Sequence, residues 1–158
     1  MNPDLESVLF QDNPWLTDKK KLAPWLSENP EPILRELLEN WVYTELAKSF
    51  GHSVPIHYRR STSGAEVDFV VVSGERILAV EVKASSVRHP RLPRSTRSFI
   101  EAYKPTRTLM VNLFLDHVEV LDKTEVKWLP PWELSNEITK IKAEASLNHG
   151  TSTSISAL

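Results

Sequence analysis

The sequence of 158 residues contains no cysteine, few glycines and no long apolar run. Without cysteine it can form neither a disulfide nor a thiolate metal site, so a metal would have to be bound by carboxylate, imidazole or carbonyl groups. No segment approaches the roughly 18 apolar residues that a membrane span requires. The amino end also lacks the basic and then apolar pattern of a secretory signal. We therefore expect a cytoplasmic protein with no membrane segment.

The formal net charge of -2 gives no overall attraction to nucleic acid. Basic residues nevertheless gather between residues 83 and 107, where Glu101 is the only acidic residue. Four arginines follow one another at short intervals there: Arg88, Arg91, Arg94 and Arg97. We expect these four side chains to bind nucleic-acid phosphates, the alternative being an ordinary solvated loop and helix.

The length and composition fit a single globular domain. We divide the chain into an amino-terminal extension packed on the body (1–29), a nuclease-like core (30–130), a carboxy-terminal helix (131–147) and a flexible tail (148–158). The tail has too few apolar residues to fold alone.

The core is predicted to begin with a helix at about residues 30–50. Asn29 can cap its first turn, Pro30 suits the first helical position, and Gly51 is a natural left-handed end. An apolar stripe follows helical spacing along this segment: Ile33, Leu34, Leu37, Leu38, Trp41, Val42 and Leu46.

Several apolar segments after this helix predict a sheet. We place strands at 54–59, 65–72, 76–83 and 107–114, with a helix at 94–103. The first three strands form an antiparallel meander, and the fourth is parallel to the third because a helix joins them. Residues 118–122 and 126–129 could add a small hairpin at an edge. The expected fold is therefore α/β, with a mixed four-stranded central sheet.

Charged residues interrupt two of these strands. Glu81 and Lys83 share one face because side chains alternate along a strand, and a hairpin turn at residues 73–75 places Asp68 opposite residue 80 or 81. Two carboxylates this close repel each other unless a cation lies between them. Mg²⁺ suits such oxygen ligands, and Lys83 could then orient a water for phosphodiester hydrolysis. The alternative is a plain ion pair at a sheet edge, which the apolar neighbours of these residues make less natural.

Three stretches, LLENWVYTEL, SGAEVDFVV and AVEVKAS, carry a family resemblance over about residues 33–116. The order of elements resembles the PD-(D/E)XK nuclease superfamily. More narrowly, the stretches resemble a domain of unknown function that follows AAA+ ATPase modules in bacterial and archaeal proteins. The resemblance implies a restriction-endonuclease-like three-layer α/β/α sandwich and a DNA endonuclease that depends on Mg²⁺ or Mn²⁺.

The resemblance also implies roles for individual residues. Asp68 and Glu81 would be metal ligands together with the peptide carbonyl of Val82, Lys83 would be the catalytic lysine, and Glu39 would be the acidic residue of the first helix. On a helical wheel Glu45 lies nearer the centre of the apolar stripe, so it stays an alternative to Glu39.

The sequence departs from the superfamily pattern at three points. Val67 replaces the proline of the motif, no Gln-x-x-x-Tyr helix follows, and no phosphate-binding loop of a P-loop ATPase is present. We expect DNA as the partner and a possible homodimer. An AAA+ ATPase module is a further candidate partner, which would be on a separate chain or absent. The alternative function is a non-catalytic nucleic-acid or protein binding module associated with an ATPase, and a third is a structural domain with an ion-pair network.

Overall fold

The structure is a computed structural model, and it describes residues 30–51, 54–60, 66–84 and 88–150. The predicted amino-terminal extension, residues 1–29, lies outside the described residues, as do residues 151–158 of the predicted tail.

The first described helix, α3 (Pro30–Phe50), has the predicted bounds. It ends where expected, because Gly51 takes a left-handed conformation with φ of 66° and its N–H donates to the carbonyl of Ala47 at 2.9 Å. The predicted apolar stripe is only partly in the core. Its buried members are Leu38, Val42 and Leu46, whereas Leu34, Leu37 and Trp41 are exposed.

The sheet has six strands in the order β1-β2-β3-β4-β6-β5. Their bounds are β1 Ile56–Arg60, β2 Glu66–Ser73, β3 Arg76–Lys83, β4 Arg107–Asn112, β5 His117–Leu121 and β6 Thr124–Leu129. The predicted meander and the parallel β3–β4 pair are present. The predicted number of four strands is wrong, because β6 pairs with β4 in parallel and carries β5 on its other edge. Strand β4 is buried almost throughout, so a second neighbour is needed to bond its outer edge.

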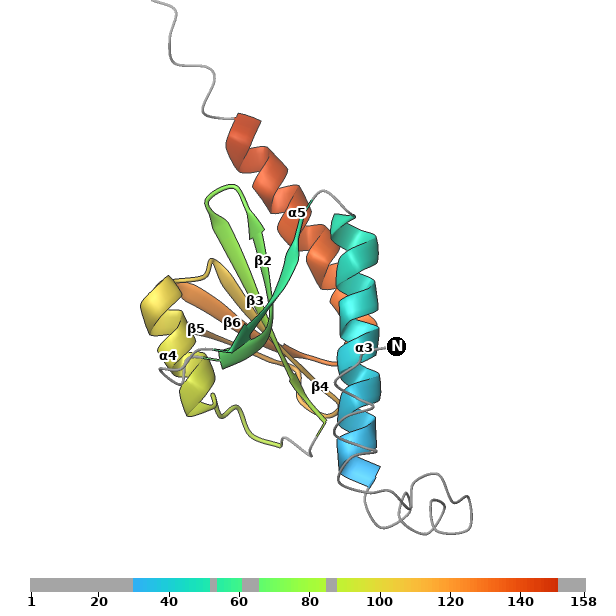
Figure 1. The fold of residues 1–158 in the computed structure, drawn as a ribbon. Helices are drawn as coiled ribbons and strands as arrows, with labels where there is room; N and C mark the ends of the chain where they lie inside the picture. Colours follow the sequence, from blue (N-terminus) through green and yellow to red (C-terminus); the bar gives the residue numbers. More distant parts are fainter. Residues whose placement is uncertain (1–29, 52–53, 61–65, 85–87, 151–158) are drawn as a thin grey trace, which may run out of the picture.

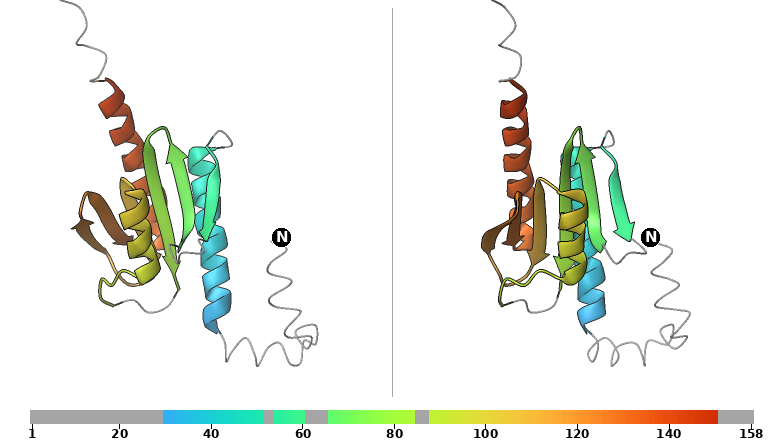
Figure 2. Two further views of the ribbon diagram at one scale, coloured as in Figure 1. Left: turned by 60° about the vertical axis from the view of Figure 1, so that its left-hand side comes forward. Right: turned by 90° about the vertical axis from the view of Figure 1, so that its left-hand side faces the viewer.

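Helices cover both faces of the sheet, and the α/β class is confirmed (Figure 1). On one face, α3 and α5 (Leu134–Gly150) share an apolar core with the strands; a short 3₁₀ turn, Pro131–Glu133, precedes α5. On the other face, α4 (Arg94–Tyr103) places Phe99 and Ile100 against the sheet. Figure 2 shows α4 and the two longer helices on opposite sides. No helix in the described part of the chain is long and apolar enough to cross a membrane.

The direction of α4 matters for the site. It joins the end of β3 to the start of β4, and these strands are parallel, so α4 runs antiparallel to both. Its first turn therefore lies at the end of the sheet where β3 finishes. In Figure 1 this end is at the bottom, together with the start of α3, and the β2–β3 hairpin turn is at the top.

Candidate active site

The pairing of β2 with β3 brings Asp68 to Glu81. The ladder runs from Ser73 opposite Arg76 to Phe69 opposite Val80, and the next step of the same register places Asp68 opposite Glu81. This is one of the two registers that the sequence predicts. The regular pairing ends at this step, so the two carboxylates lie where β2 and β3 begin to separate.

The pairing of β1 with β2 shifts register in the same part of β2, as at a β-bulge. His57 of β1 is opposite Val70, and Arg59 is opposite Val67, so three steps along β2 match two along β1. The extra residue lies between Val67 and Val70, in the part of β2 that contains Asp68. Bulges bend a strand and redirect a side chain. Asp68 is therefore freed from the strict alternation of its strand.

The side chain of Asp68 is bonded to the main chain of β3. The N–H of Val82 donates to the Oδ2 of Asp68 at 2.7 Å. In a β-strand the N–H and C=O of one residue point to the same edge, so the carbonyl of Val82 also faces the β2 side. The two groups that the resemblance implies as metal ligands here, the carboxylate of Asp68 and the carbonyl of Val82, thus lie on the same side of β3.

Lys83 contacts Glu81 directly. Its Nζ lies 2.5 Å from the Oε1 of Glu81, as expected for residues two apart on one face of a strand. The side chain of Glu81 is 7% exposed and that of Lys83 is 30% exposed. The ammonium group thus meets the carboxylate at the boundary between the core and the solvent.

Helix α3 contributes a charged pair, Arg35 and Glu39, to the site. Of the two, only Glu39 was predicted from the sequence. The Nε of Arg35 donates to the Oε1 of Glu39 at 2.6 Å, and its Nη2 lies 3.8 Å from the Oδ1 of Asp68. Glu39 is therefore linked to Asp68 through a guanidinium rather than through direct contact. The spacing of Arg35 and Glu39, four residues apart on a predicted helix, was the signal available in the sequence.

The alternative residue Glu45 has a different partner. Its Oε1 accepts a bond from the Nζ of Lys48 at 2.9 Å, within α3. Six residues separate it from Glu39, which corresponds to about 9 Å along the helix axis. Glu39, and not Glu45, belongs to the charged group around Asp68.

Both strand carboxyls hold their protons more tightly than usual. Burial raises the pKa of Asp68 to about 7, the nearby charge of Glu81 adds to the effect, and the N–H of Val82 opposes it. Burial also raises the pKa of Glu81, although the Lys83 ammonium acts in the opposite direction. The site therefore carries the repulsion between carboxylates that the sequence predicts, and a cation would relieve it.

The donor set at this point is small. Within the described ranges, no group of three or more histidine, aspartate or glutamate side chains is placed to hold a metal ion. Asp68, Glu81 and the carbonyl of Val82 offer oxygen donors from two side chains and one peptide. This set suits Mg²⁺, which usually keeps several waters and takes one or two carboxylates.

The four arginines that we predict to bind phosphates follow the end of β3 in the chain. Arg88 and Arg91 lie in the segment that precedes α4, and Arg94 and Arg97 lie in its first turn. All four are exposed, and none forms an ion pair with another described residue. Their charges are available to a partner.

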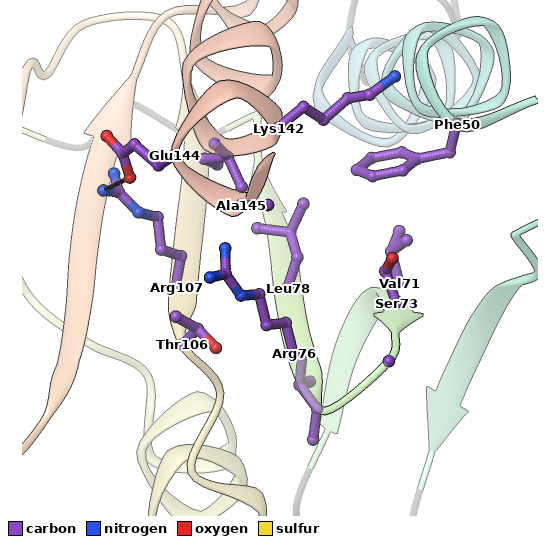
Figure 3. A pocket seen from close by; sticks show the side chains of 13 residues that line it. Phe50, Val71, Ser73, Arg76, Leu78, Thr106, Arg107, Lys142, Glu144 and Ala145 are labelled. Carbon is purple, nitrogen blue, oxygen red and sulfur yellow. Dashed lines mark hydrogen bonds and ion pairs between the residues drawn. The ribbon is translucent and has the colours of Figure 1, made fainter. Parts of the chain in front are cut away.

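A pocket of about 170 Å³ lies at the other end of the sheet, between the β2–β3 hairpin and α5. Figure 3 shows its apolar wall beside the guanidinium groups of Arg76 and Arg107. Arg107 is bonded to Glu144 at 2.7 Å and also contacts two other glutamates, Glu125 and Glu137. None of the predicted site residues lines this pocket.

Comparison with known families gives a match over most of the described core. The family described as a domain of unknown function, DUF4143, matches residues 35–132, well over half of the chain. The chain belongs to this family. The match includes Arg35, Glu39, both strand carboxylates and the four arginines, so the candidate site lies within the family domain. No curated protein matches the sequence.

Proposed function

We propose that this protein is a DNA endonuclease of the PD-(D/E)XK type that depends on Mg²⁺ or Mn²⁺. The observation that carries the proposal is the meeting of Asp68, Glu81 and Lys83 at the point where β2 and β3 separate. The strand order β1-β2-β3-β4, with an antiparallel meander followed by a parallel strand, supports the restriction-endonuclease-like α/β/α fold that this nuclease type has.

Each residue then has a defined task. Asp68 and Glu81 would hold the cation together with the carbonyl of Val82. When bound, the cation would polarise a phosphoryl oxygen and lower the pKa of a water molecule. Lys83 would hold that water and stabilise negative charge that develops on the phosphate. Arg35 keeps Glu39 close to Asp68, which gives Glu39 its assisting place in the site.

The exposed arginines would bind the phosphates of DNA. Contacts with phosphates position a protein on DNA without reading its sequence. Arg88, Arg91, Arg94 and Arg97 lie next to the end of β3 in the chain, so phosphates bound by them would lie close to Lys83. This arrangement supports DNA as the substrate.

The test is a cleavage assay on single-stranded, duplex and branched DNA with Mg²⁺, Mn²⁺ or chelator. We expect cutting that needs the metal and that falls at least about 100-fold in Lys83→Ala. Lys123→Ala is the matched control, because Lys123 is exposed in the β5–β6 turn, away from the site. Absence of cutting on every substrate, or equal cutting by Lys83→Ala and the wild type, would refute the proposal.

The exposed arginines also favour a second candidate, a non-catalytic DNA-binding module that works with an ATPase. This function requires the arginines and not the carboxylates. Salt-sensitive DNA binding without cutting, unchanged in Asp68→Asn, is the result that would select it.

A further inference from the structure

Two buried hydroxyl groups in the described part of the chain have no hydrogen-bond partner in the protein: those of Thr96 in α4 and Thr108 in β4. Both residues are 0% exposed. A buried hydroxyl without a partner destabilises a fold, and valine has the same shape without the polar atom. A threonine at such a place therefore needs a reason beyond packing.

The position of Thr96 suggests that reason. Phe99, three residues later on the same buried side of α4, shares an apolar cluster with Ala79 of β3. Thr96 thus lies about 4.5 Å closer to the start of the helix than Phe99. Glu81 lies two residues beyond Ala79 on the same face of β3, about 6.6 Å along the strand. Because α4 is antiparallel to β3, both displacements point to the same end of the sheet, so Thr96 lies toward the end that carries Glu81 and on the face to which Glu81 projects.

Thr108 provides a comparison within the same layer. It is opposite Ala79 in the β3–β4 ladder. It is therefore on the strand next to that of Glu81 and two residues short of Glu81 along the strand direction. The two threonines are alike in burial and in the lack of a partner, but they differ in their distance from the carboxylate.

We propose that Thr96 is a positioning residue of the candidate site, and that its hydroxyl binds a water molecule shared with Glu81. The inference rests on the proposed nuclease function. A water bound to both groups would have its lone pairs and hydrogens oriented before DNA arrives.

The experiment compares Thr96→Val, Thr96→Ser and Thr108→Val with the full-length wild type. Removal of an unpartnered hydroxyl should raise the unfolding temperature of Thr108→Val in chelator by about 2 to 4 °C, whereas Thr96→Val should show no such rise because its hydroxyl binds the shared water. The rate of DNA cleavage should distinguish the two valine variants. Thr96→Val should lower kcat between about 10-fold and 100-fold with KM unchanged, Thr96→Ser should stay within about threefold of the wild type, and Thr108→Val should cut normally.

Each other outcome overturns the inference. A Thr96→Val variant that cuts like the wild type shows that the hydroxyl has no role, and an equal loss in Thr108→Val shows a packing effect. A rise in the unfolding temperature of Thr96→Val as large as that of Thr108→Val shows that the Thr96 hydroxyl binds no water. If the wild type cuts no DNA while only Thr108→Val is more stable, the proposed function itself has failed, and the catalytic role of Thr96 fails with it.

Discussion

The main-chain N–H of Val82 donates to the carboxylate of Asp68 at 2.7 Å, at the step where the β2–β3 ladder has just ended. A side-chain oxygen here takes the place that a strand carbonyl would have in a continued ladder. The bond fixes Asp68 beside Glu81 although the main chains diverge. The two strands therefore diverge while their carboxylates stay close together.

The raised pKa of Asp68 predicts how stability depends on pH. In the unfolded chain the group has its ordinary pKa of 3.8, and in the folded protein it is about 7. Between these values the folded state keeps a proton that the unfolded state has lost, so the free energy of unfolding should fall as the pH rises, by at most about 1.4 kcal/mol per pH unit. Above pH 7 this contribution should level off.

Urea unfolding between pH 4 and 8.5 in chelator measures this dependence. The free energy of unfolding of Asp68→Asn should depend less on pH than that of the wild type. The control Asp116→Asn, at an exposed position, should keep the wild-type slope. Added Mg²⁺ should restore stability most at the alkaline end, where both carboxylates are charged. A wild-type profile as flat as that of Asp68→Asn would contradict the burial of this carboxyl.

The local parts of the site could be predicted from the sequence. The turn at residues 73–75 and the period of two along a strand sufficed to place Asp68 within one residue of Glu81 across the hairpin and to bring Lys83 to Glu81. Capping residues sufficed for α3 in the same way. In each case, residues close in the sequence determine the geometry.

The remaining features depend on contacts between distant segments. Arg35 meets Asp68 across 33 positions of the chain, and β6 joins β4 only after β5 has turned back. The exposure of Leu37 within an apolar stripe depends on which segments pack against that side of α3. The pattern of a single segment carries no information on such neighbours.

Arg35 predicts a change in metal affinity. Its guanidinium lies beside Asp68 and is positively charged, so it repels a divalent cation bound at that carboxylate. Arg35→Gln should therefore bind Mn²⁺ about three to ten times more tightly at pH 8.5, where competition from protons is small. Titration calorimetry measures this, with Arg91→Gln as the control for loss of one exposed arginine. Weaker binding by Arg35→Gln would show that the guanidinium organises the carboxylates instead.

The exposed arginines predict a specific salt dependence of DNA binding. If each contacts one phosphate, the double variant Arg88→Gln/Arg91→Gln should reduce the slope of log K against log salt by about 0.9 for each lost contact with duplex DNA. The loss should be the same for different DNA sequences. Fluorescence anisotropy in chelator, between about 50 and 200 mM salt, measures the slope without cutting. Arg76→Gln, at the opposite end of the sheet, should keep the wild-type slope, and an equal change there would indicate a non-specific charge effect.

Two glutamates that share Arg107 predict very different effects on stability. The carboxylate of Glu137 lies 3.3 Å from the Nη1 of Arg107 and 2.6 Å from the Nζ of Lys127, and its side chain is 4% exposed. Glu144 lies 2.7 Å from the Nη2 of Arg107, but its side chain is 54% exposed. Removal of a buried partner leaves charges uncompensated, whereas an exposed pair contributes little because water screens it.

Glu137→Ala should therefore lower the free energy of unfolding by about 3 kcal/mol, and Glu144→Ala by less than about 1 kcal/mol. Urea unfolding at pH 7 measures both, and equal losses would mean that the network acts only as surface charge. Glu137 belongs to α5, which covers the same sheet face as α3, and it bonds to β4 and β6. Because these contacts hold the scaffold and not the carboxylates, DNA cleavage by folded Glu137→Ala at low temperature should match the wild type.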